Sequence, residues 1–453
     1  MPKPLLFQED LIDLYDHQGP RYSSYPPSTE FRQTITESHF REWARSSNEE
    51  LIPRPLSLYF HIPFCSSICH FCACNKVIGQ SEQEAEPYLQ AMHREIEIQS
   101  RLFDRDREVR LLHWGGGTPG FLTRQQSQQL MDKIARHFKL SQGGEGDYSI
   151  EIDPRVMEPG AASHLRNLGF NRISIGVQEL DAKVQKSINR IQSLESIERV
   201  IRDARRAGFR SINIDLMYGL PQQTVTSFAA TLKTITELEP DRIALYHYTH
   251  LPEQFPAQRR IKAEDLPGST DKLTMLQSAA DQLYATGYAH IGMDYFARQL
   301  DELTVAQRRG RLRRNFRGYS AHEQCDSVGF GVSAISQVHE NLSQNAVSLD
   351  DYHECLDRQR LPLMRGHQSS DDDLLRREII QNLSCQFRID TRQISDDWAI
   401  DYDDYFSNEM KLLRVMAKDG LINIADNEIR VLEPGRLLLH NICTVFDVYR
   451  RPE

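Results

Sequence analysis

The chain has 453 residues, of which 40% are hydrophobic and 26% are charged, so its composition excludes a disordered or a fibrous protein. Its 64 acidic and 54 basic residues give a net charge of -10, which disfavours non-specific binding to nucleic acid or to anionic lipid. No apolar run approaches the roughly 18 residues of a membrane span and the start is acidic, so we expect a cytoplasmic protein with no membrane span and no nucleic-acid partner.

Residues 1–54 are predicted to form an N-terminal arm. They contain the segment PRYSSYPP, from Pro20 to Pro27, and show no long hydrophobic period. An extended segment of this kind needs another part of the chain to lie on. We therefore expect the arm to fold over the mouth of the main domain.

From Leu56 onward, short runs of β-branched and aromatic residues alternate with amphipathic stretches. The runs predict strands at 56–62, 109–114, 148–152, 172–177, 211–217 and 242–248. The stretches between them predict helices, among them 85–102, 123–138, 194–207 and 226–238. Repeated strand-helix units imply a parallel sheet that closes wholly or partly. The expected fold class is α/β, with a partial (β/α)6 barrel over residues 55–365.

Polar residues and glycines stand at the ends of these predicted strands. They are Cys65, the run Gly115 to Pro119, Glu151, Gln178, Asp215 and Tyr248. The carboxyl ends of the strands in a parallel α/β barrel meet at one rim, where the loops that carry chemistry converge. We expect these residues to share that rim.

Residues 366–453 are predicted to form a separate, mostly helical C-terminal domain. Acidic helical sequence is followed by two short alternating runs around Asp426 and Asn427, and a last helix starts near Pro434. Helix, hairpin and helix are compatible with a winged unit, but no basic run accompanies them. We therefore expect the C-terminal domain to pack against the barrel rather than to bind nucleic acid.

Four of the eight cysteines fall within ten residues, at positions 65, 69, 72 and 74. Cys65, Cys69 and Cys72 have the spacing C-x3-C-x2-C, and no second cysteine pair completes a structural zinc site. Three thiolates on a 4Fe-4S cluster leave one iron open for an exogenous donor, which is typical of a catalytic cluster. Cys74 is separated from Cys72 by one residue, so we do not expect it to ligate the same cluster; it is either a participant in the reaction or incidental.

The motifs around these positions resemble those of a known family. They are GPRYSSYP, LSLYFHIPFC, CHFCACNK, LHWGGGTP, IEIDP, GFNRISIGVQ, NIDLMYGLP, GMDYFA, RRNFRGY and GVSAIS. Together they are similar to the radical S-adenosylmethionine (radical SAM) superfamily and, within it, to the oxygen-independent coproporphyrinogen III oxidases. The resemblance implies one 4Fe-4S cluster with three cysteine ligands and two molecules of S-adenosylmethionine in one site.

The resemblance also implies which residues contact S-adenosylmethionine. They are Tyr59, Phe71, Gly116, Gly117, Thr118, Glu151, Gln178, Arg190, Asp215, Thr249 and Ile335. Glycines let the backbone approach a ligand closely, carboxylates accept hydrogen bonds from ribose or amino groups, and amide or guanidinium groups donate to a carboxylate. Tyr59 and Phe71 are equally compatible with core aromatics, and Thr249 departs from the small alanine that the family often has there.

The implied reaction converts two propionates of coproporphyrinogen III to vinyl groups, giving protoporphyrinogen IX. It requires an electron donor of the flavodoxin or ferredoxin type and an electron acceptor whose identity is unknown, and we expect a monomer. The substrate carries four carboxylates, so Arg314, in a run of arginines from Arg308 to Arg317, and Arg21, in the arm, are candidate catalytic contacts beside Cys74. A solvated arginine run is the plainer alternative. A haem-binding chaperone or another radical enzyme of tetrapyrroles is the alternative function.

Overall fold

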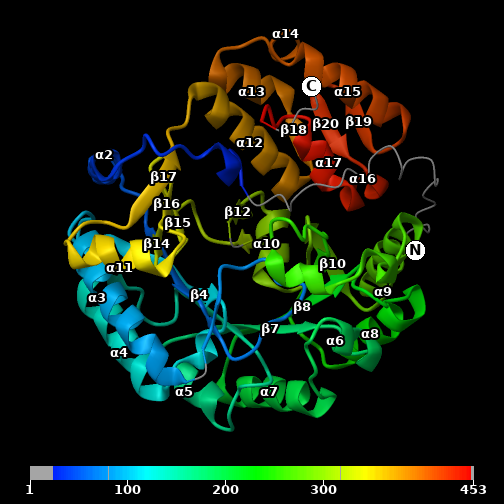
Figure 1. The fold of residues 1–453 in the computed structure, drawn as a ribbon. Helices are drawn as coiled ribbons and strands as arrows, with labels where there is room; N and C mark the ends of the chain where they lie inside the picture. The colour runs from blue at the N-terminus through cyan, green and yellow to red at the C-terminus, as the bar shows by residue number, and fades with distance from the viewer. Residues whose placement is uncertain (1–23, 80, 317, 450–453) are drawn as a thin grey trace.

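The computed structural model describes residues 24–79, 81–316 and 318–449, and its main body is a curved sheet with helices on the outer side (Figure 1). Six parallel strands form the centre of the sheet in the order in which they occur along the chain. They are β1 (Leu56–Ile62), β4 (Glu108–Gly116), β6 (Asp147–Ile152), β7 (Arg172–Gln178), β8 (Ser211–Tyr218) and β9 (Arg242–His247). The predicted partial (β/α)6 barrel is confirmed, with each strand within two residues of its predicted bounds.

The helices between the strands cover the outer side of the sheet (Figure 1). The four predicted helices are confirmed as α3 (Glu86–Ser100), α4 (Arg124–His137), α7 (Leu194–Ala207) and α8 (Val225–Glu237). Three further helices, α5 (Ala161–Asn167), α6 (Ala182–Ser187) and α9 (Ser269–Ala285), are not among those predicted from the sequence. Local sequence sets the helix starts: at α4, Gln126 N–H donates to the Thr123 hydroxyl at 3.1 Å, and Thr123 N–H donates to the Gln126 side chain at 3.0 Å.

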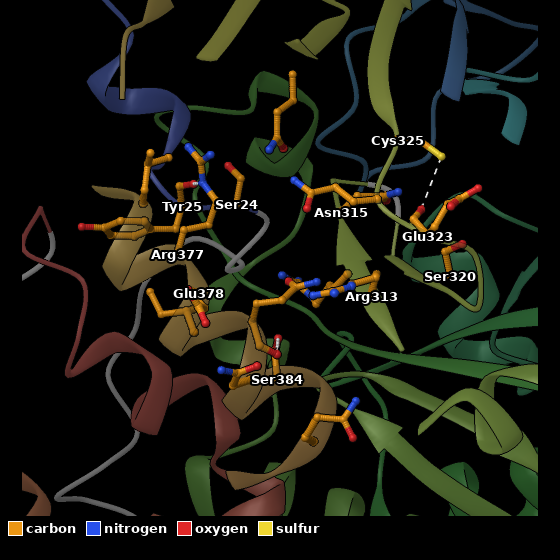
Figure 2. A pocket seen from close by; sticks show the side chains of 18 of the residues that line it. Ser24, Tyr25, Arg313, Asn315, Ser320, Glu323, Cys325, Arg377, Glu378 and Ser384 are labelled. Carbon is orange, nitrogen blue, oxygen red and sulfur yellow. Dashed lines mark hydrogen bonds between the residues drawn. The ribbon is translucent and has the colours of Figure 1, made fainter. Parts of the chain in front are cut away.

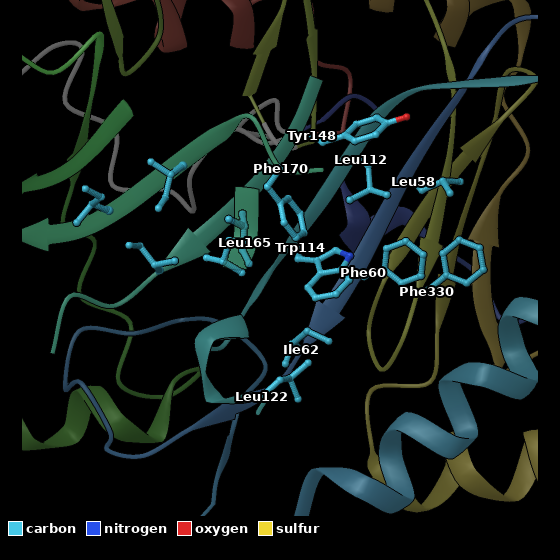
Figure 3. Packing of buried hydrophobic residues seen from close by; sticks show 14 of the residues in the cluster. Leu58, Phe60, Ile62, Leu112, Trp114, Leu122, Tyr148, Leu165, Phe170 and Phe330 are labelled. Atoms are coloured by element: carbon cyan, nitrogen blue, oxygen red, sulfur yellow. The ribbon is translucent and has the colours of Figure 1, made fainter. Parts of the chain in front are cut away.

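Apolar and polar side chains alternate along the strands, so the sheet has an apolar outer face and a polar inner face. In β1, Leu58, Phe60 and Ile62 point toward the helices and are fully buried. Phe60 stacks on Phe330 with ring centroids 4.7 Å apart, and Trp114 of β4 lies beside it (Figure 3). The other face of β1 carries serine, tyrosine and histidine, so the inside of the barrel is polar.

The sheet continues beyond the six central strands on both sides. Next to β1 it adds β14 (Asp326–Phe330), β15 (Ile335–Val338), β16 (Asn341–Asn345) and β17 (Leu363–His367); next to β9 it adds β11 (Tyr295–Arg298) and β10 (Tyr288–Gly292). Of these, only β14 runs parallel to its neighbour β1. In the described part of the chain, the end strands β10 and β17 do not pair with each other, so the barrel is open.

Short elements complete the main body. The strands are β2 (Phe64–Cys65), β3 (Val77–Ile78), β5 (Lys139–Leu140), β12 (Arg313–Asn315) and β13 (Gly318–Ser320). The helices are α10 (Glu302–Arg308), α11 (Leu349–Asp357) and the 3-10 turns η2 (Glu82–Ala85), η3 (Pro119–Phe121), η4 (Pro256–Arg260) and η5 (Ala263–Asp265).

The described part of the predicted arm is not extended throughout. It contains η1 (Ser28–Glu30) and the helix α2 (Glu37–Asn48), which buries Phe40, Trp43 and Ala44. The Ser47 hydroxyl donates to buried Asp326, which pairs in register with Leu56 at the start of β1. Helix α2 therefore packs near the amino end of β1. The rest of the arm, residues 1–23, lies outside the described residues, and its position over the mouth stays a prediction.

Residues after β17 form a second hydrophobic cluster at one end of the molecule (Figure 1). It is built by α12 (Asp371–Gln386), β18 (Arg388–Asp390), α13 (Thr391–Trp398), α14 (Tyr402–Tyr405), α15 (Ser407–Lys418), β19 (Ile422–Ala425), β20 (Glu428–Val431), α16 (Glu433–Leu437) and α17 (Leu439–Thr444). The proposed boundary after residue 365 falls inside β17, which belongs to the barrel sheet. Among the helices of the described segments, none has the length and apolar character needed to cross a bilayer.

Candidate functional site

The three cysteines of the C-x3-C-x2-C motif lie on one loop that follows the carboxyl end of β1. Its two ends are joined by the pairing of β2 with β3, and Cys72 N–H donates to the Cys69 carbonyl at 3.2 Å. The loop is also tied to the glycine run after β4, because Gly117 N–H donates to the Ile62 carbonyl at 2.8 Å. The chain's own hydrogen bonds thus hold the three thiols on the same side of the sheet.

Two guanidinium groups donate to the sulfur of Cys69. Arg190 reaches it at 3.5 Å and Arg155 at 3.7 Å. Both arginines also pair with Asp153, at 3.0 and 2.6 Å, and are thereby fixed in place. The two guanidinium groups thus place positive charge beside the Cys69 sulfur.

The other two motif cysteines differ in acidity. A hydrogen bond with Cys74, opposed by burial and helped by the nearby Lys76, lowers the pKa of Cys72 to about 6. Burial raises the pKa of Cys65 to about 11, although its sulfur lies 3.5 Å from the Thr118 hydroxyl. Cys69 and Cys72 both act on Cys65 electrostatically, which places the three thiols near one another.

The three thiols form a donor set that fits an iron-sulfur cluster, because soft thiolate ligands suit such clusters. In a 4Fe-4S cluster each thiolate binds a different iron, so the thiols stand apart. Three neighbouring cysteines, with arginine donors on one of them, match that requirement.

The wall of the site beside the loop is a hydrogen-bonded set of polar side chains on β1, β4 and β6. The Tyr59 hydroxyl lies 2.9 Å from His61 Nδ1, and the Tyr59 ring stacks on His113 at 5.8 Å. His113 Nε2 lies 3.0 Å from one oxygen of Glu151, and the other oxygen accepts Gly116 N–H at 3.2 Å. Burial opposes ionisation of Glu151, but its hydrogen bonds with His113 and Gly116 lower its pKa overall. Glu151 is therefore an ionised acceptor at this wall.

The glycine run is required by close packing. A Cβ on Gly117 would lie 2.5 Å from the Pro63 carbonyl oxygen, and one on Gly115 would lie 2.9 Å from Glu151. Gly116 has φ 110°, which residues with a side chain rarely adopt. The run brings the β4 backbone against the cysteine loop, with Thr118 at its end.

Gln178 gives the clearest sign that a ligand belongs here. It ends β7 with φ 71°, and its side-chain oxygen is buried without a hydrogen-bond partner among the described residues. Such an oxygen costs free energy unless a donor supplied by a ligand satisfies it. Next to it, Asp215 of β8 accepts hydrogen bonds from Ser174 at 3.0 Å and Asn213 at 2.7 Å. These groups fit the polar parts of S-adenosylmethionine.

The other predicted cofactor contacts lie around the same end of the barrel. Phe71 packs against an apolar cluster that includes Val184 and Ile188. Thr249 is half-buried and follows Tyr248, whose hydroxyl lies 2.8 Å from His250 Nδ1. Ile335 begins β15, directly after the turn that follows β14. Their contact with a cofactor stays a prediction.

The structure separates Cys74 from Arg314, two of the three predicted catalytic residues. Cys74 is exposed on the cysteine loop beside Cys72. Arg21 lies outside the described residues. Arg314, on β12, lines a cavity of about 740 Å³ that also touches Ser57 and Leu111 near the amino ends of β1 and β4. The ends of β1 are roughly 20 Å apart, so the structure does not bring Arg314 to the cysteine loop.

The Arg314 cavity lies between the barrel and α12 (Figure 2). Arg313 reaches into it, with Arg377 and Tyr25 on one side and Cys325 on the other (Figure 2). Arg377 is fully engaged, donating to the Tyr25 carbonyl at 3.0 Å and pairing with Glu340 at 3.2 Å. The Arg314 guanidinium lies 5.9 Å from the Tyr319 ring centre.

Three residues of the site, His61, His113 and Arg155, are not predicted from the sequence. His61 and His113 share the inner face of their strands with Tyr59 and Gly115, so alternation along β1 and β4 was the available signal. Arg155 follows the IEIDP motif and reaches Cys69 only because the chain turns back after β6. No pattern in the sequence indicates that contact.

Comparisons with known proteins agree with this site. A model of the Radical SAM superfamily matches residues 59–235. The chain is 47% identical over 440 residues to the oxygen-independent coproporphyrinogen III oxidase of Pseudomonas aeruginosa, covering 97% of this chain and 95% of that protein. The enzyme of the same name from Escherichia coli is 45% identical over 441 residues, with the same coverage of both chains.

A solved structure has the same fold over the full length. It is coproporphyrinogen III oxidase from Escherichia coli, a radical SAM enzyme, which aligns with a TM-score of 0.92 and 44% identity over 99% of this chain and 100% of that chain. Matched to these relatives from one end to the other, the chain belongs to the oxygen-independent coproporphyrinogen III oxidases of the radical SAM superfamily.

Proposed function

We propose that the chain catalyses the oxygen-independent oxidative decarboxylation of coproporphyrinogen III to protoporphyrinogen IX, a step of haem and porphyrin biosynthesis. The observation that carries this proposal is the 47% identity, over 97% of the chain, to a protein named for the oxidation of coproporphyrinogen III. The protein is thus an oxidoreductase that converts two propionate side chains to vinyl groups.

Cys65, Cys69 and Cys72 would hold one 4Fe-4S cluster, and the wall of Tyr59, Glu151 and Gln178 would hold two molecules of S-adenosylmethionine. When bound, these groups would supply the radical chemistry needed to remove a β-hydrogen from a propionate. The rest of the reaction depends on how the protein binds, orients and shields the reactants.

The chain's own residues supply that binding. Ionised Glu151 accepts hydrogen bonds from amino or ribose groups, and the unpartnered Gln178 oxygen accepts one more. Arg190, nine-tenths buried, holds Cys69 and Asp153 in a fixed relation, so the loop keeps its position when a ligand enters. We include Phe71, Thr249 and Ile335 as further contacts.

The proposal extends to the partners of the reaction. The donor is an electron carrier of the flavodoxin or ferredoxin type, and a separate acceptor of unknown identity takes the last electron of each decarboxylation. Arg21 contacts a substrate carboxylate, and Cys74 takes part near the cluster. Arg314, whose cavity touches the amino ends of β1 and β4, is not included among these contacts. The enzyme works as a monomer in the cytoplasm.

The test is a product assay under anaerobic conditions. Protein reconstituted with iron and sulfide, then given dithionite, S-adenosylmethionine, coproporphyrinogen III and cell extract as the source of the electron acceptor, should yield protoporphyrinogen IX, measured by chromatography after oxidation to the fluorescent porphyrin. The Cys65→Ser variant should give no product. Absence of vinyl product from protein with an intact cluster would contradict the proposal and favour the haem-binding alternative.

A further inference from the structure

Exposed basic side chains gather on two elements beside the cysteine loop, α6 and η4. The exposed cations of residues 181–190 and 251–265 are Lys183, Lys186, Arg259, Arg260 and Lys262, whereas the exposed acidic residues there are Glu253 and Glu264. Lys262 pairs with Glu264 at 3.6 Å. The other four cations form no ion pair with any described residue. We call these four residues, Lys183, Lys186, Arg259 and Arg260, the basic face.

Helix α6 and the residues after it are fastened to the cysteine loop. Asn189 donates from its side chain to the Ile68 carbonyl at 2.8 Å. His70 N–H donates to the Ile188 carbonyl at 3.0 Å, and His70 Nδ1 lies 3.1 Å from the Ser187 carbonyl. These contacts involve the residues between Cys65 and Cys72, so α6 lies directly against the segment that carries the thiols.

The turn η4 is fastened to the same loop from another part of the chain. Gln258, within η4, donates to the Phe71 carbonyl at 3.2 Å. Ile261, which follows the turn, shares one buried apolar cluster with Val184 and Ile188 of the α6 region, and Phe71 packs on that cluster. The basic face therefore belongs to two elements that pack together and both contact the cysteine loop.

A local excess of positive charge is notable in a chain of net charge -10. Exposed unpaired cations raise the rate at which an oppositely charged partner docks, and the effect weakens as salt screens it. Any protein that reduces a cluster on this loop has to approach the loop itself. The positive charges of the basic face lie on α6 and η4, which contact the loop, and would attract an acidic protein toward it.

We infer that the basic face docks an acidic protein that carries one electron at low potential. The inference rests on the proposed function and specifies the surface used by its electron donor. One electron passes from the reduced carrier to the oxidised cluster, so the carrier is oxidised and the cluster reduced by one equivalent, with no bond formed and no proton moved. A small, salt-sensitive interface is typical of such transient electron-transfer complexes.

The experiment compares charge reversals on and away from the basic face. The test variant is Lys183→Glu with Lys186→Glu, and the matched control is Lys411→Glu with Lys418→Glu, two exposed lysines of α15. Each variant, loaded with cluster, is titrated with fluorescently labelled acidic flavodoxin at low salt, and the rate of cluster reduction by that carrier and by dithionite is followed by stopped-flow absorbance.

The test variant should bind the carrier about tenfold more weakly and lose most of the salt dependence of binding, whereas the control should match the wild type. Reduction by dithionite should be unchanged in both, and Arg259→Glu with Arg260→Glu should reproduce the weakened binding. Equal effects of the test and control variants, or unchanged binding of the test variant, would overturn the inference. Product formed with dithionite separates this outcome from a failure of the proposed function.

Discussion

The three motif thiols occupy different environments although they share one loop. The pKa of Cys72 is lowered to about 6, so its thiol loses its proton near neutral pH. Burial raises the pKa of Cys65 to about 11, so its thiol stays protonated there. Cys69 lies beneath two arginine donors. Sequence spacing treats the three positions alike, so these differences come only from the residues that the fold brings to them.

Cys74 provides a test at the scale of one side chain. It is separated from Cys72 by one residue, which makes it hard for both thiols to reach one cluster, so a Cys74→Ser variant should retain the full iron content and cluster absorbance after reconstitution. Cys65→Ser, Cys69→Ser and Cys72→Ser should each lose them, because each removes a ligand. Loss of the cluster from Cys74→Ser would show that this thiol is a fourth ligand.

Other parts of the site could be read from the sequence only in outline. Glu151 and Gln178 lie at the carboxyl ends of β6 and β7, as expected from the parallel topology, whereas Asp215 lies three residues before the end of β8. The positive φ of Gln178 and its unpartnered oxygen depend on the turn between β7 and α6, which no local pattern specifies.

At the scale of elements, Tyr88 of α3 joins the start of the cysteine loop to the turn after β14. Its hydroxyl donates to the His61 carbonyl at 2.7 Å and accepts Val332 N–H at 3.0 Å. Close by, buried Glu95 accepts hydrogen bonds from Gly331 N–H at 2.8 Å and from Tyr352 at 2.6 Å. Helix α3 thus holds β1 and the β14–β15 turn in a fixed relation.

A Tyr88→Phe variant should lose about 2 kcal/mol of unfolding free energy, because it leaves a buried carbonyl and a buried N–H unpaired. It should also bind S-adenosylmethionine several-fold more weakly, since the loop and the turn then shift independently. Denaturant titration and equilibrium binding measure the two effects.

Tyr148→Phe is the matched control. The Tyr148 hydroxyl also bridges two backbone groups, donating to Val109 O at 3.0 Å and accepting Ser141 N–H at 2.7 Å, at the amino end of β4. It should cost similar stability without weakening ligand binding. Equal losses of affinity in both variants would contradict a positioning role for Tyr88.

The strands themselves differ in how well their sequence predicts them. β1 reads LSLYFHI and alternates between apolar and polar residues, so its bounds are predicted without error. β16 reads NLSQN, yet all five of its residues are buried. Its polar side chains are satisfied by partners distant in sequence; Asn345, for example, donates to Glu95 at 2.7 Å. The sequence around β16 gives no strand signal because burial there depends on those tertiary contacts.

At the scale of the whole molecule, an ion-pair network closes the amino end of the barrel. Asp147 at the start of β6 pairs with Arg172 of β7 and lies 3.1 Å from His322 Nε2. Glu302 of α10 joins Arg172 to Arg242 of β9. The network links β6 and β7 to segments more than 100 residues later in the chain, and β9 to a segment 60 residues later.

The hydrogen bond with Asp147 raises the pKa of His322 above its usual value, and the His322 and Arg172 contacts overcome burial to lower that of Asp147 to about 2. A histidine whose pKa is higher in the folded protein than in the unfolded chain stabilises the fold at pH values below the unfolded pKa of about 6.5. This contribution disappears as the pH rises through the pKa of the folded protein. His322→Gln should therefore cost roughly 1 to 2 kcal/mol near pH 5.5 and much less near pH 9.

Denaturant titrations of the wild type and of His322→Gln at the two pH values provide the measurement. A cost that is equal at both pH values would show that His322 stabilises the fold without its charge. The contribution of Asp147 to the free energy of unfolding has the opposite pH dependence, because the lowered pKa of its carboxyl means that this contribution is lost as the solution is acidified through about pH 2.

The hydrogen bonds that close the cysteine loop bear on how the enzyme matures. Val77 N–H donates to the Pro63 carbonyl at 2.8 Å and Gly79 N–H to the Cys65 carbonyl at 3.0 Å, and Asn189 and Gln258 secure the segment between them. Because these contacts involve only polypeptide groups, we expect polypeptide folding to precede metal delivery. We then expect the newly made chain to accept a preassembled cluster from a biosynthetic scaffold, or to replace one lost to oxygen, without first unfolding.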